Sequence, residues 1–310
     1  MNFFLSLFNS LPGAVTQGLL WGIMGIGVYA VTYRILDVAD LTVDGTLATG
    51  GALCVMLMRL GCNPWIALLC AFLAGMLAGL VTGLFHTRCG IPAILAGILT
   101  QLALYSVNLR IMGGKANLPI SVDKYDLLVS QRYVRELSLR NPLPLAILFL
   151  VVMIAALYWF FGTEYGSALR ATGANPHMAR AQGINTGAKV TVGLMLSNGL
   201  VAASGALLAQ YQGAADVNMG RGAIVIGLAA VIIGDVLLGK LVHNFALKLG
   251  TVVVGAVIYY VVIQLVLQLG LNTNDLKLLT ALVVAVFLAV PYWKAQVFRK
   301  KQVTGGGGNA

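Results

Sequence analysis

The sequence predicts an all-α, polytopic membrane protein with about nine transmembrane helices. Hydrophobic residues make up 59% of the 310 residues and charged residues only 10%, whereas roughly 25% charged residues are usual in a soluble domain. The mean hydropathy of +0.89 agrees. Long apolar runs recur along the whole chain with short polar connections between them, so we expect about eight to ten spans. No separate soluble domain fits, and residues 1–310 form a single predicted transmembrane domain.

Each apolar run is close to the length of about 20 residues that an α-helix needs to cross a bilayer. The runs lie at 11–33, 42–58, 64–85, 91–111, 143–162, 190–211, 222–239, 247–269 and 278–292. Several carry glycines one turn apart, such as Gly75, Gly79 and Gly83 in the third run. Small residues at this spacing let helix backbones approach closely in lipid, so we expect tight packing between helices there.

The composition excludes several function classes. The net charge of +10 is spread over short clusters between apolar runs, which favours orientation in a lipid bilayer over binding of nucleic acid. The four cysteines and three histidines show no metal-ligand spacing, so no metal site is expected. The segment "GDVLLGKL" has the glycine and lysine spacing of a phosphate-binding loop, but Leu241 stands where a serine or threonine would hold magnesium.

No catalytic arrangement is found in the apolar runs, because they contain neither paired carboxylates nor a serine, histidine and aspartate set. We therefore expect no enzyme activity and no bound cofactor on this chain. Any energy for transport must come from an ion gradient or from a separate subunit.

Few acidic residues fall in the apolar runs. Asp40 and Asp44 begin the second run, and Asp235 lies near the end of the seventh. Each either caps a helix end or faces a cavity, and we favour capping for Asp40 and Asp235. A carrier coupled to protons or sodium would usually place acidic residues near the middle of the bilayer instead.

Neutral polar residues recur at helical spacing in the fourth, sixth and eighth runs. Such faces either line a path through the membrane or hydrogen-bond one helix to another. The candidates for a path are Asp44, Gln101, Tyr105, Asn108, Asn198 and Gln264.

Two polar connections are long, 113–140 and 163–189. They lie on opposite sides of the membrane if the run at 143–162 crosses once. The counts of lysine and arginine on the two sides do not decide which is cytosolic; only the basic carboxyl-terminal end points inward.

The second connection contains "GSALRATGANPHMARAQGIN". Asn175 is a good helix cap, Pro176 suits the first helical position and Gly183 suits a stop. The pattern predicts a short amphipathic helix at about 176–182. Such a helix is either an ordinary surface element or a docking site for a partner.

This stretch resembles the cytosolic loop of bacterial ABC importer permeases of the branched-chain amino acid and ribose-type family. In that loop a glycine follows the triplet "EAA" at the fourth residue after its last alanine. Here His177, Met178 and Ala179 occupy the triplet, and Gly183 is the glycine. "ADLTVDGT", "GIPAILAGILT" and "GLAAVIIGDVLLG" are also similar to family segments, so that the resemblance covers roughly residues 15–290.

The resemblance implies a type II-like ABC importer permease fold and assigns sides to the two connections. The short helix would be a coupling helix on a cytosolic ATPase, and the connection 113–140 would be extracytoplasmic and meet a substrate-binding protein. The residues implied in coupling are Arg170, Gly173, Asn175, Pro176, His177, Met178, Ala179, Arg180 and Gly183. Those implied in docking of the binding protein are Lys115, Lys124, Arg132 and Arg135.

The resemblance further implies a multi-pass protein of the bacterial inner membrane that works as a dimer, expected to be a homodimer, with two ATPase subunits that hold ATP and magnesium. An amino acid is the leading substrate class, and a sugar or a nucleoside is the alternative. An ion-coupled secondary transporter is the rival from another class. A channel is disfavoured, because the runs contain no ring of charge and no carbonyl filter sequence.

Overall fold

The computed structural model describes residues 3–134, 141–239, 242, 244–268, 278, 281, 282, 284–286 and 289. Helices occupy the first eight predicted runs, and the ninth, 278–292, lies largely outside the described residues. These helices are α1 (Phe3–Gly27) with its π-helical continuation η1 (Val28–Leu36), α2 (Val43–Arg59), α3 (Pro64–Thr87), α4 (Ala93–Ile111), α5 (Pro142–Gly162), α8 (Thr186–Gln212), α9 (Ala223–Leu238) and α10 (Phe245–Gln268). The prediction of an all-α polytopic fold is confirmed.

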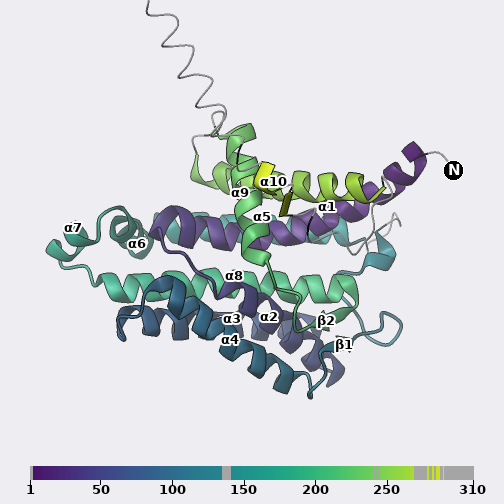
Figure 1. Cartoon of the computed structure of the whole chain (residues 1–310), viewed down its shortest axis with the longest axis horizontal. Helices are drawn as coiled ribbons and strands as arrows, with labels where there is room; N and C mark the ends of the chain where they lie inside the picture. The colour runs from purple at the N-terminus through teal and green to yellow at the C-terminus, as the bar shows by residue number, and fades with distance from the viewer. Residues whose placement is uncertain are drawn as a thin grey trace, which may run out of the picture.

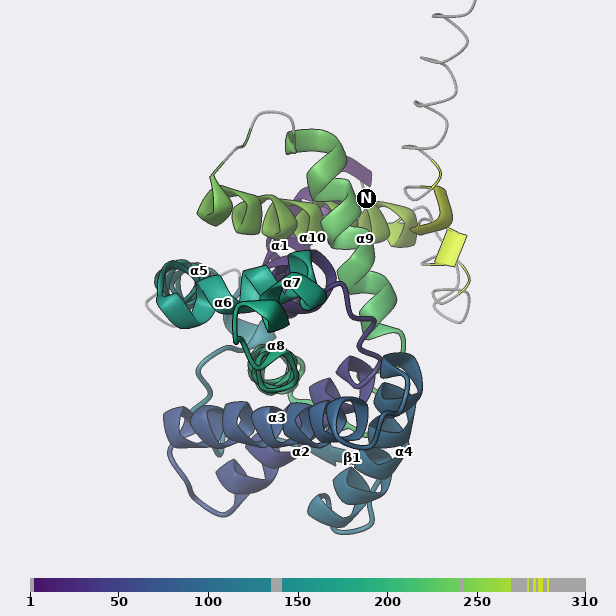
Figure 2. The same cartoon turned by 90° about the vertical axis from the view of Figure 1, so that its left-hand side faces the viewer.

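Helix α8 lies at the centre of the bundle. It contacts α1, α2 and α3, and in the end-on view of Figure 2 it lies between α1 and α10 on one side and α2 to α4 on the other. The expected close packing is confirmed, because Cβ atoms added at Gly75 and Gly79 of α3 would collide with the α8 backbone at Asn198 and Leu194. Ser204 of α8 also donates a hydrogen bond of 2.8 Å to the carbonyl oxygen of Leu20 in α1.

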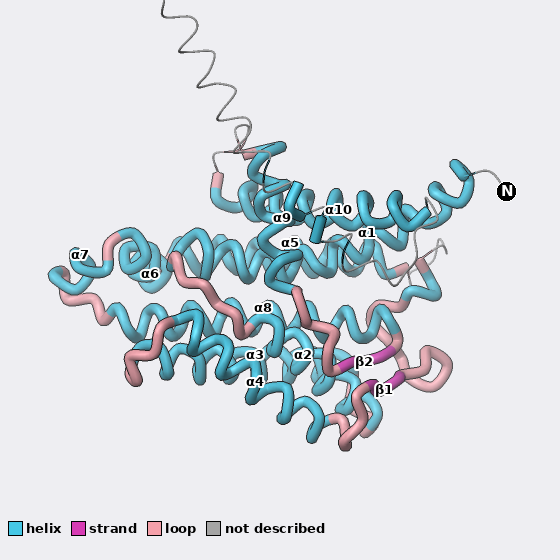
Figure 3. Tube along the Cα trace, in the orientation of Figure 1, coloured by secondary structure: helices cyan, strands magenta, loops and turns pink. Residues whose placement is uncertain are grey.

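Two of the helices in the predicted runs are short. α2 has 17 residues and α9 has 16, fewer than the about 20 that a full crossing needs. α2 follows the loop 37–42 and α9 follows the loop 217–222, and Figure 3 shows both loops running back along α8. Both helices therefore begin between the two ends of α8. The runs at 42–58 and 222–239, which the sequence treats as possible spans, thus form helices that start inside the bundle. Among the described helices, α3, α4, α5, α8 and α10 are each long and apolar enough to cross a membrane.

The two long connections lie at opposite ends of the bundle, as predicted (Figure 1). At one end, α6 (Glu164–Ala174) and α7 (Pro176–Ala181) extend beyond the other helices. At the other end, β1 (Asn117–Pro119) and β2 (Ala214–Asp216) pair antiparallel, with Leu118 opposite Ala215, and the 3-10 helix η2 (Gln131–Tyr133) follows in the same connection. The strand pair ties this connection to the end of α8.

Candidate functional site

The short helix predicted at 176–182 is confirmed as α7. The side chain of Asn175 accepts hydrogen bonds from the backbone nitrogens of His177 at 3.1 Å and Met178 at 3.0 Å, so Asn175 is its cap. Gly183 has φ of +79° and ends the helix, because few residues with a side chain adopt this conformation. The local signals in the sequence were therefore sufficient to place this helix.

α7 presents one buried and several exposed side chains. Ala179 is 1% exposed, whereas Met178 is 60% exposed and His177 is also exposed. An exposed methionine at the tip of a protruding helix is a suitable contact for an apolar groove on a partner. The positions of His177 and Met178 fit their predicted role in coupling, which remains a prediction.

The two arginines of this region already have partners inside the chain. The guanidinium of Arg170 donates to the carbonyl oxygen of Phe161 at 2.7 Å, and Nε of Arg180 donates to Oγ1 of Thr186 at 2.9 Å. Both side chains are exposed and retain further donors. Arg170 thus joins α6 to the end of α5, and Arg180 joins α7 to the start of α8.

Gly173 fixes α6 against the end of the first helix. A Cβ at Gly173 would collide with the carbonyl oxygen of Ile35 in η1. Nζ of Lys189 in α8 lies 3.0 Å from the ring centroid of Tyr165, in the first turn of α6. The loop that carries α7 is therefore packed against both η1 and α8.

The residues predicted to meet a binding protein lie at the opposite end. Lys115, Lys124 and Arg132 are exposed, and Arg135 lies outside the described residues. Nη1 of Arg132 lies 2.6 Å from a carboxylate oxygen of Asp123, so this positive charge is offset within the connection. Lys115 and Lys124 thus contribute more to the positive field of this end than Arg132 does.

Asp40 does not cap α2 as the sequence favoured, because the residue that precedes α2 is Thr42 and no side chain there accepts a hydrogen bond from the helix. The carboxylate of Asp40, 3% exposed, accepts from the backbone nitrogen of Thr42 at 2.9 Å and from Nδ2 of Asn198 at 2.6 Å. Asn198 also accepts from Oγ1 of Thr46 at 2.8 Å and is fully buried. Asn198 therefore hydrogen-bonds α8 to α2, and its role in a path stays a prediction.

Asp44 joins the beginnings of the two short helices. Its carboxylate oxygens accept from the backbone nitrogens of Gly222 at 2.9 Å and Ile224 at 3.1 Å, in the first turn of α9. A Cβ at Gly220 would collide with the carbonyl oxygen of Asp44, so the two segments are in close contact. Capping of α9 by Asp235 is wrong, because Asp235 lies in the last turn of α9, where carbonyl groups rather than N–H groups are free.

A cavity of about 340 Å³ lies beside this contact. Asp44, Gln101, Tyr105 and Asn108 all line it, so the structure brings together four of the residues predicted for a path. Oδ1 of Asn108 accepts no hydrogen bond from any residue that the structure describes, although Asn108 is only 1% exposed.

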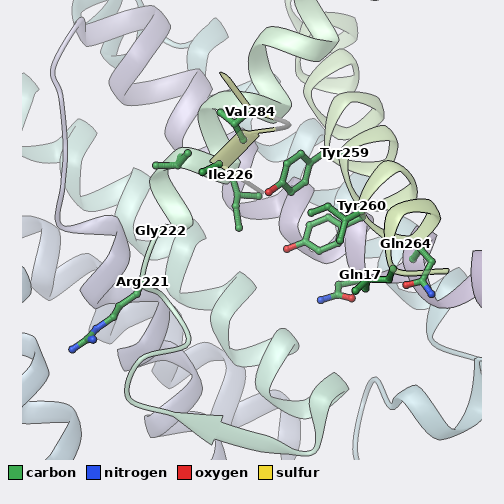
Figure 4. Close-up of a pocket in the computed structure, with 13 residues that line it drawn as sticks. Gln17, Arg221, Gly222, Ile226, Tyr259, Tyr260, Gln264 and Val284 are labelled. Carbon is green, nitrogen blue, oxygen red and sulfur yellow. The ribbon is translucent and has the colours of Figure 1, made fainter. Parts of the chain in front are cut away.

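A second cavity, of about 690 Å³, lies on the other side of the start of α9. Gln264, also predicted for a path, lines it together with Gln17 and Tyr260. Figure 4 shows Gln17, Tyr260 and Gln264 close to one another. Most of the remaining lining is apolar, so this cavity offers room for a bulky group.

Arg221 lines both cavities, and the sequence reasoning missed it. It directly precedes α9, at the edge of an apolar run, where a charge is usually taken to lie at the membrane surface. The structure instead places the start of α9 between the ends of α8 (Figure 1). The signal that was available is the pair of glycines on either side, Gly220 and Gly222, because glycine allows tight turns and close approach of the backbone.

Comparison with known proteins agrees with this arrangement. The family described as "Branched-chain amino acid transport system / permease component" matches residues 10–291. The chain is 41% identical over 281 residues to a tyrosine transport system permease protein of Clostridioides difficile, with 91% of each chain covered. It is 35% identical over 286 residues to the uncharacterized protein RP368 of Rickettsia prowazekii, with 91% and 97% covered. It is 26% identical over 233 residues to the ribose import permease protein RbsC of Escherichia coli, with 75% and 70% covered.

Proposed function

The chain belongs to the permease family of branched-chain amino acid transport systems, and we propose that it forms the path through which an ABC importer brings an aromatic amino acid such as tyrosine across the membrane. It is a multi-pass permease subunit in the bacterial inner membrane. Permeases of this family work with ATPase subunits and a substrate-binding protein. The observation that carries the substrate proposal is the 41% identity to a tyrosine permease over 91% of both chains.

The two cavities support an amino acid over the alternative of a sugar or a nucleoside. Sugars and nucleosides carry no charge at neutral pH, whereas an amino acid carries both a carboxylate and an ammonium group. The smaller cavity presents one acidic and one basic side chain, Asp44 and Arg221. The relative that carries ribose is also more distant, at 26% identity.

We further infer the division of work in the complex. Two copies of this chain form the path, expected as a homodimer, and two ATPase subunits bind ATP and magnesium and hydrolyse the ATP. This chain contributes no catalytic residue and acts as a single transmembrane domain. α7 is the coupling helix, which is supported by its exposed Met178 and by the packing of its loop against η1 and α8.

Co-purification tests the coupling role. The solubilised chain is expressed with the ATPase encoded beside its gene, and residues 176–182 are replaced by a glycine-serine linker. We expect the wild-type chain to retain the ATPase and the linker variant to lose it while still eluting as a folded dimer. A linker variant that still accumulates substrate from an ion gradient alone would instead support a secondary transporter.

The substrate is tested by competition. Proteoliposomes that hold the complete importer are given radiolabelled tyrosine with an excess of unlabelled phenylalanine, leucine, ribose or uridine. We expect phenylalanine to compete and ribose and uridine to leave uptake unchanged. Competition by ribose or uridine would contradict the proposed substrate class.

A further inference from the structure

Arg221 is a cation at the junction of the two cavities. Its side chain is exposed, and within the described part of the chain its guanidinium forms no ion pair and donates no hydrogen bond. Charged residues at membrane depth are costly, and those that occur usually face a water-filled path or a ligand. The position of Arg221 at the junction of two cavities therefore points to an anionic group that passes there.

The backbone around Arg221 is held in place. Gly220 packs against the backbone of Asp44, and Gly222 has φ of +85° and donates its N–H to the Asp44 carboxylate. Figure 4 shows the guanidinium group of Arg221 pointing away from the rings of Tyr259 and Tyr260. The cation is thus aimed at the smaller cavity by a rigid turn, which is the arrangement that a binding group needs.

The smaller cavity also offers groups for a cation. The carboxylate of Asp44 has lone pairs beyond those used by Gly222 and Ile224. Oδ1 of Asn108 is a buried acceptor with no donor among the described residues. Acidic and acceptor groups therefore share a cavity of about 340 Å³ with the unpaired guanidinium, and this volume is in the range of small-ligand sites.

We propose that the smaller cavity is a head-group site of the translocation path, in which Arg221 binds the carboxylate of an amino acid and Asp44 with Asn108 binds its ammonium group. This inference rests on the proposed import of amino acids. An arginine binds a carboxylate through two parallel hydrogen bonds. The side chain of the solute extends past Gly222 toward the larger cavity of about 690 Å³.

Such a site recognises only the carboxylate and ammonium groups, which all amino acids share. The larger cavity is mostly apolar and roomy, so it imposes little choice among side chains. Selection among amino acids is then left to the binding protein, while the path accepts what is delivered and excludes solutes without the paired charges.

A cysteine reporter beside Arg221 tests this site directly. Val225 lies one turn along α9, lines the larger cavity and is 45% exposed. Val225→Cys is introduced into a chain in which Cys62, Cys70 and Cys89 are changed to serine, while the buried Cys54 is kept. The complete importer in lipid nanodiscs is labelled with anionic ethylsulfonate and cationic ethyltrimethylammonium thiosulfonate reagents. Phenylalanine and phenethylamine, which lacks the carboxylate, are added as protecting probes.

We expect the ratio of anionic to cationic labelling rates to fall at least about fivefold in Arg221→Gln. Arg221→Lys should keep most of the ratio, which separates loss of charge from loss of structure. Arg59→Gln, which removes an exposed cation in the last turn of α2, at the other end of that helix from Asp44, is the matched control. Phenylalanine should slow labelling only when residue 221 is Arg or Lys, and phenethylamine should slow it little.

The outcomes separate the site from the proposed function. An unchanged rate ratio in Arg221→Gln, or equal protection by phenylalanine and phenethylamine, would contradict the head-group site even in an importer that transports amino acids. Protection that depends on Arg221 in an importer that takes up no amino acid would support the site and contradict the proposed function.

Discussion

The carboxylate of Asp44 lies 2.9 Å from the backbone nitrogen of Gly222, although the two residues are 178 positions apart in the chain. This contact joins the start of α2 to the start of α9. Both helices therefore begin inside the bundle, where a helix end without a partner would leave buried N–H groups unpaired.

Removal of this cap should destabilise the permease. Asp44→Ala leaves the first N–H groups of α9 without an acceptor, and we expect a loss of about 1–2 kcal/mol in stability. Asp44→Asn should lose less, since its amide oxygen can still accept one of the two hydrogen bonds. Thermal unfolding in detergent measures both. The matched control is Asp235→Asn in the last turn of α9, and an Asp44→Ala variant that unfolds at the wild-type temperature would contradict the structural role of Asp44.

Gly173 should be intolerant of any side chain. Gly173→Ala places a methyl group against the Ile35 carbonyl, so α6 must move away from η1 at a cost of about 1–3 kcal/mol. We expect a lower yield of coupled transport, measured as solute molecules imported per ATP hydrolysed. Gly162→Ala, where a Cβ meets only open space, is the control and should behave as wild type. Equal coupling in the two variants would show that α6 and η1 need not stay in contact.

The cap of α7 should matter for binding of the ATPase. Asn175→Ala removes two hydrogen bonds to the first turn of a six-residue helix, and loss of such a cap costs about 1 kcal/mol. We therefore expect roughly fivefold weaker binding of the purified ATPase subunits, measured by titration of nanodiscs that contain the permease. Gln182→Ala, at the exposed other end of α7, should have little effect. Unchanged affinity in Asn175→Ala would mean that a folded α7 is not required for docking.

Charge at the opposite end should affect encounter with the binding protein. Reversal of Lys115 and Lys124, which form no ion pair with the residues that the structure describes, by Lys115→Glu with Lys124→Glu should slow association. The difference should shrink at high salt. Arg132→Glu should have a smaller effect, because Asp123 already offsets the charge of Arg132. Association rates from surface plasmon resonance at two salt concentrations test this. A larger effect from Arg132 than from the lysine pair would contradict it.

The helices were predictable because each apolar run must satisfy its backbone hydrogen bonds internally in lipid, and α7 was predictable because Asn175, Pro176 and Gly183 are local signals. The depth at which α2 and α9 begin was not predictable, because it depends on a hydrogen bond between Gly222 and Asp44, which are far apart in the sequence. Arg221 was missed for the same reason, because a charge at the edge of an apolar run gives no sign of how deep that edge lies. The different positions of Asn198 and Gln101 were not predictable either. Both side chains are polar amides, and polarity alone does not say which one bonds to a neighbouring helix and which one lines a cavity.

The measurement that tests the central claim most directly is uptake of radiolabelled tyrosine by proteoliposomes that contain this chain, the ATPase subunits and the binding protein. We expect accumulation that requires ATP and all three components, persists when a protonophore collapses the ion gradients, and falls strongly in Arg221→Gln while the binding protein still stimulates ATP hydrolysis. Uptake by this chain alone that the protonophore abolishes would contradict the account and identify a gradient-driven carrier.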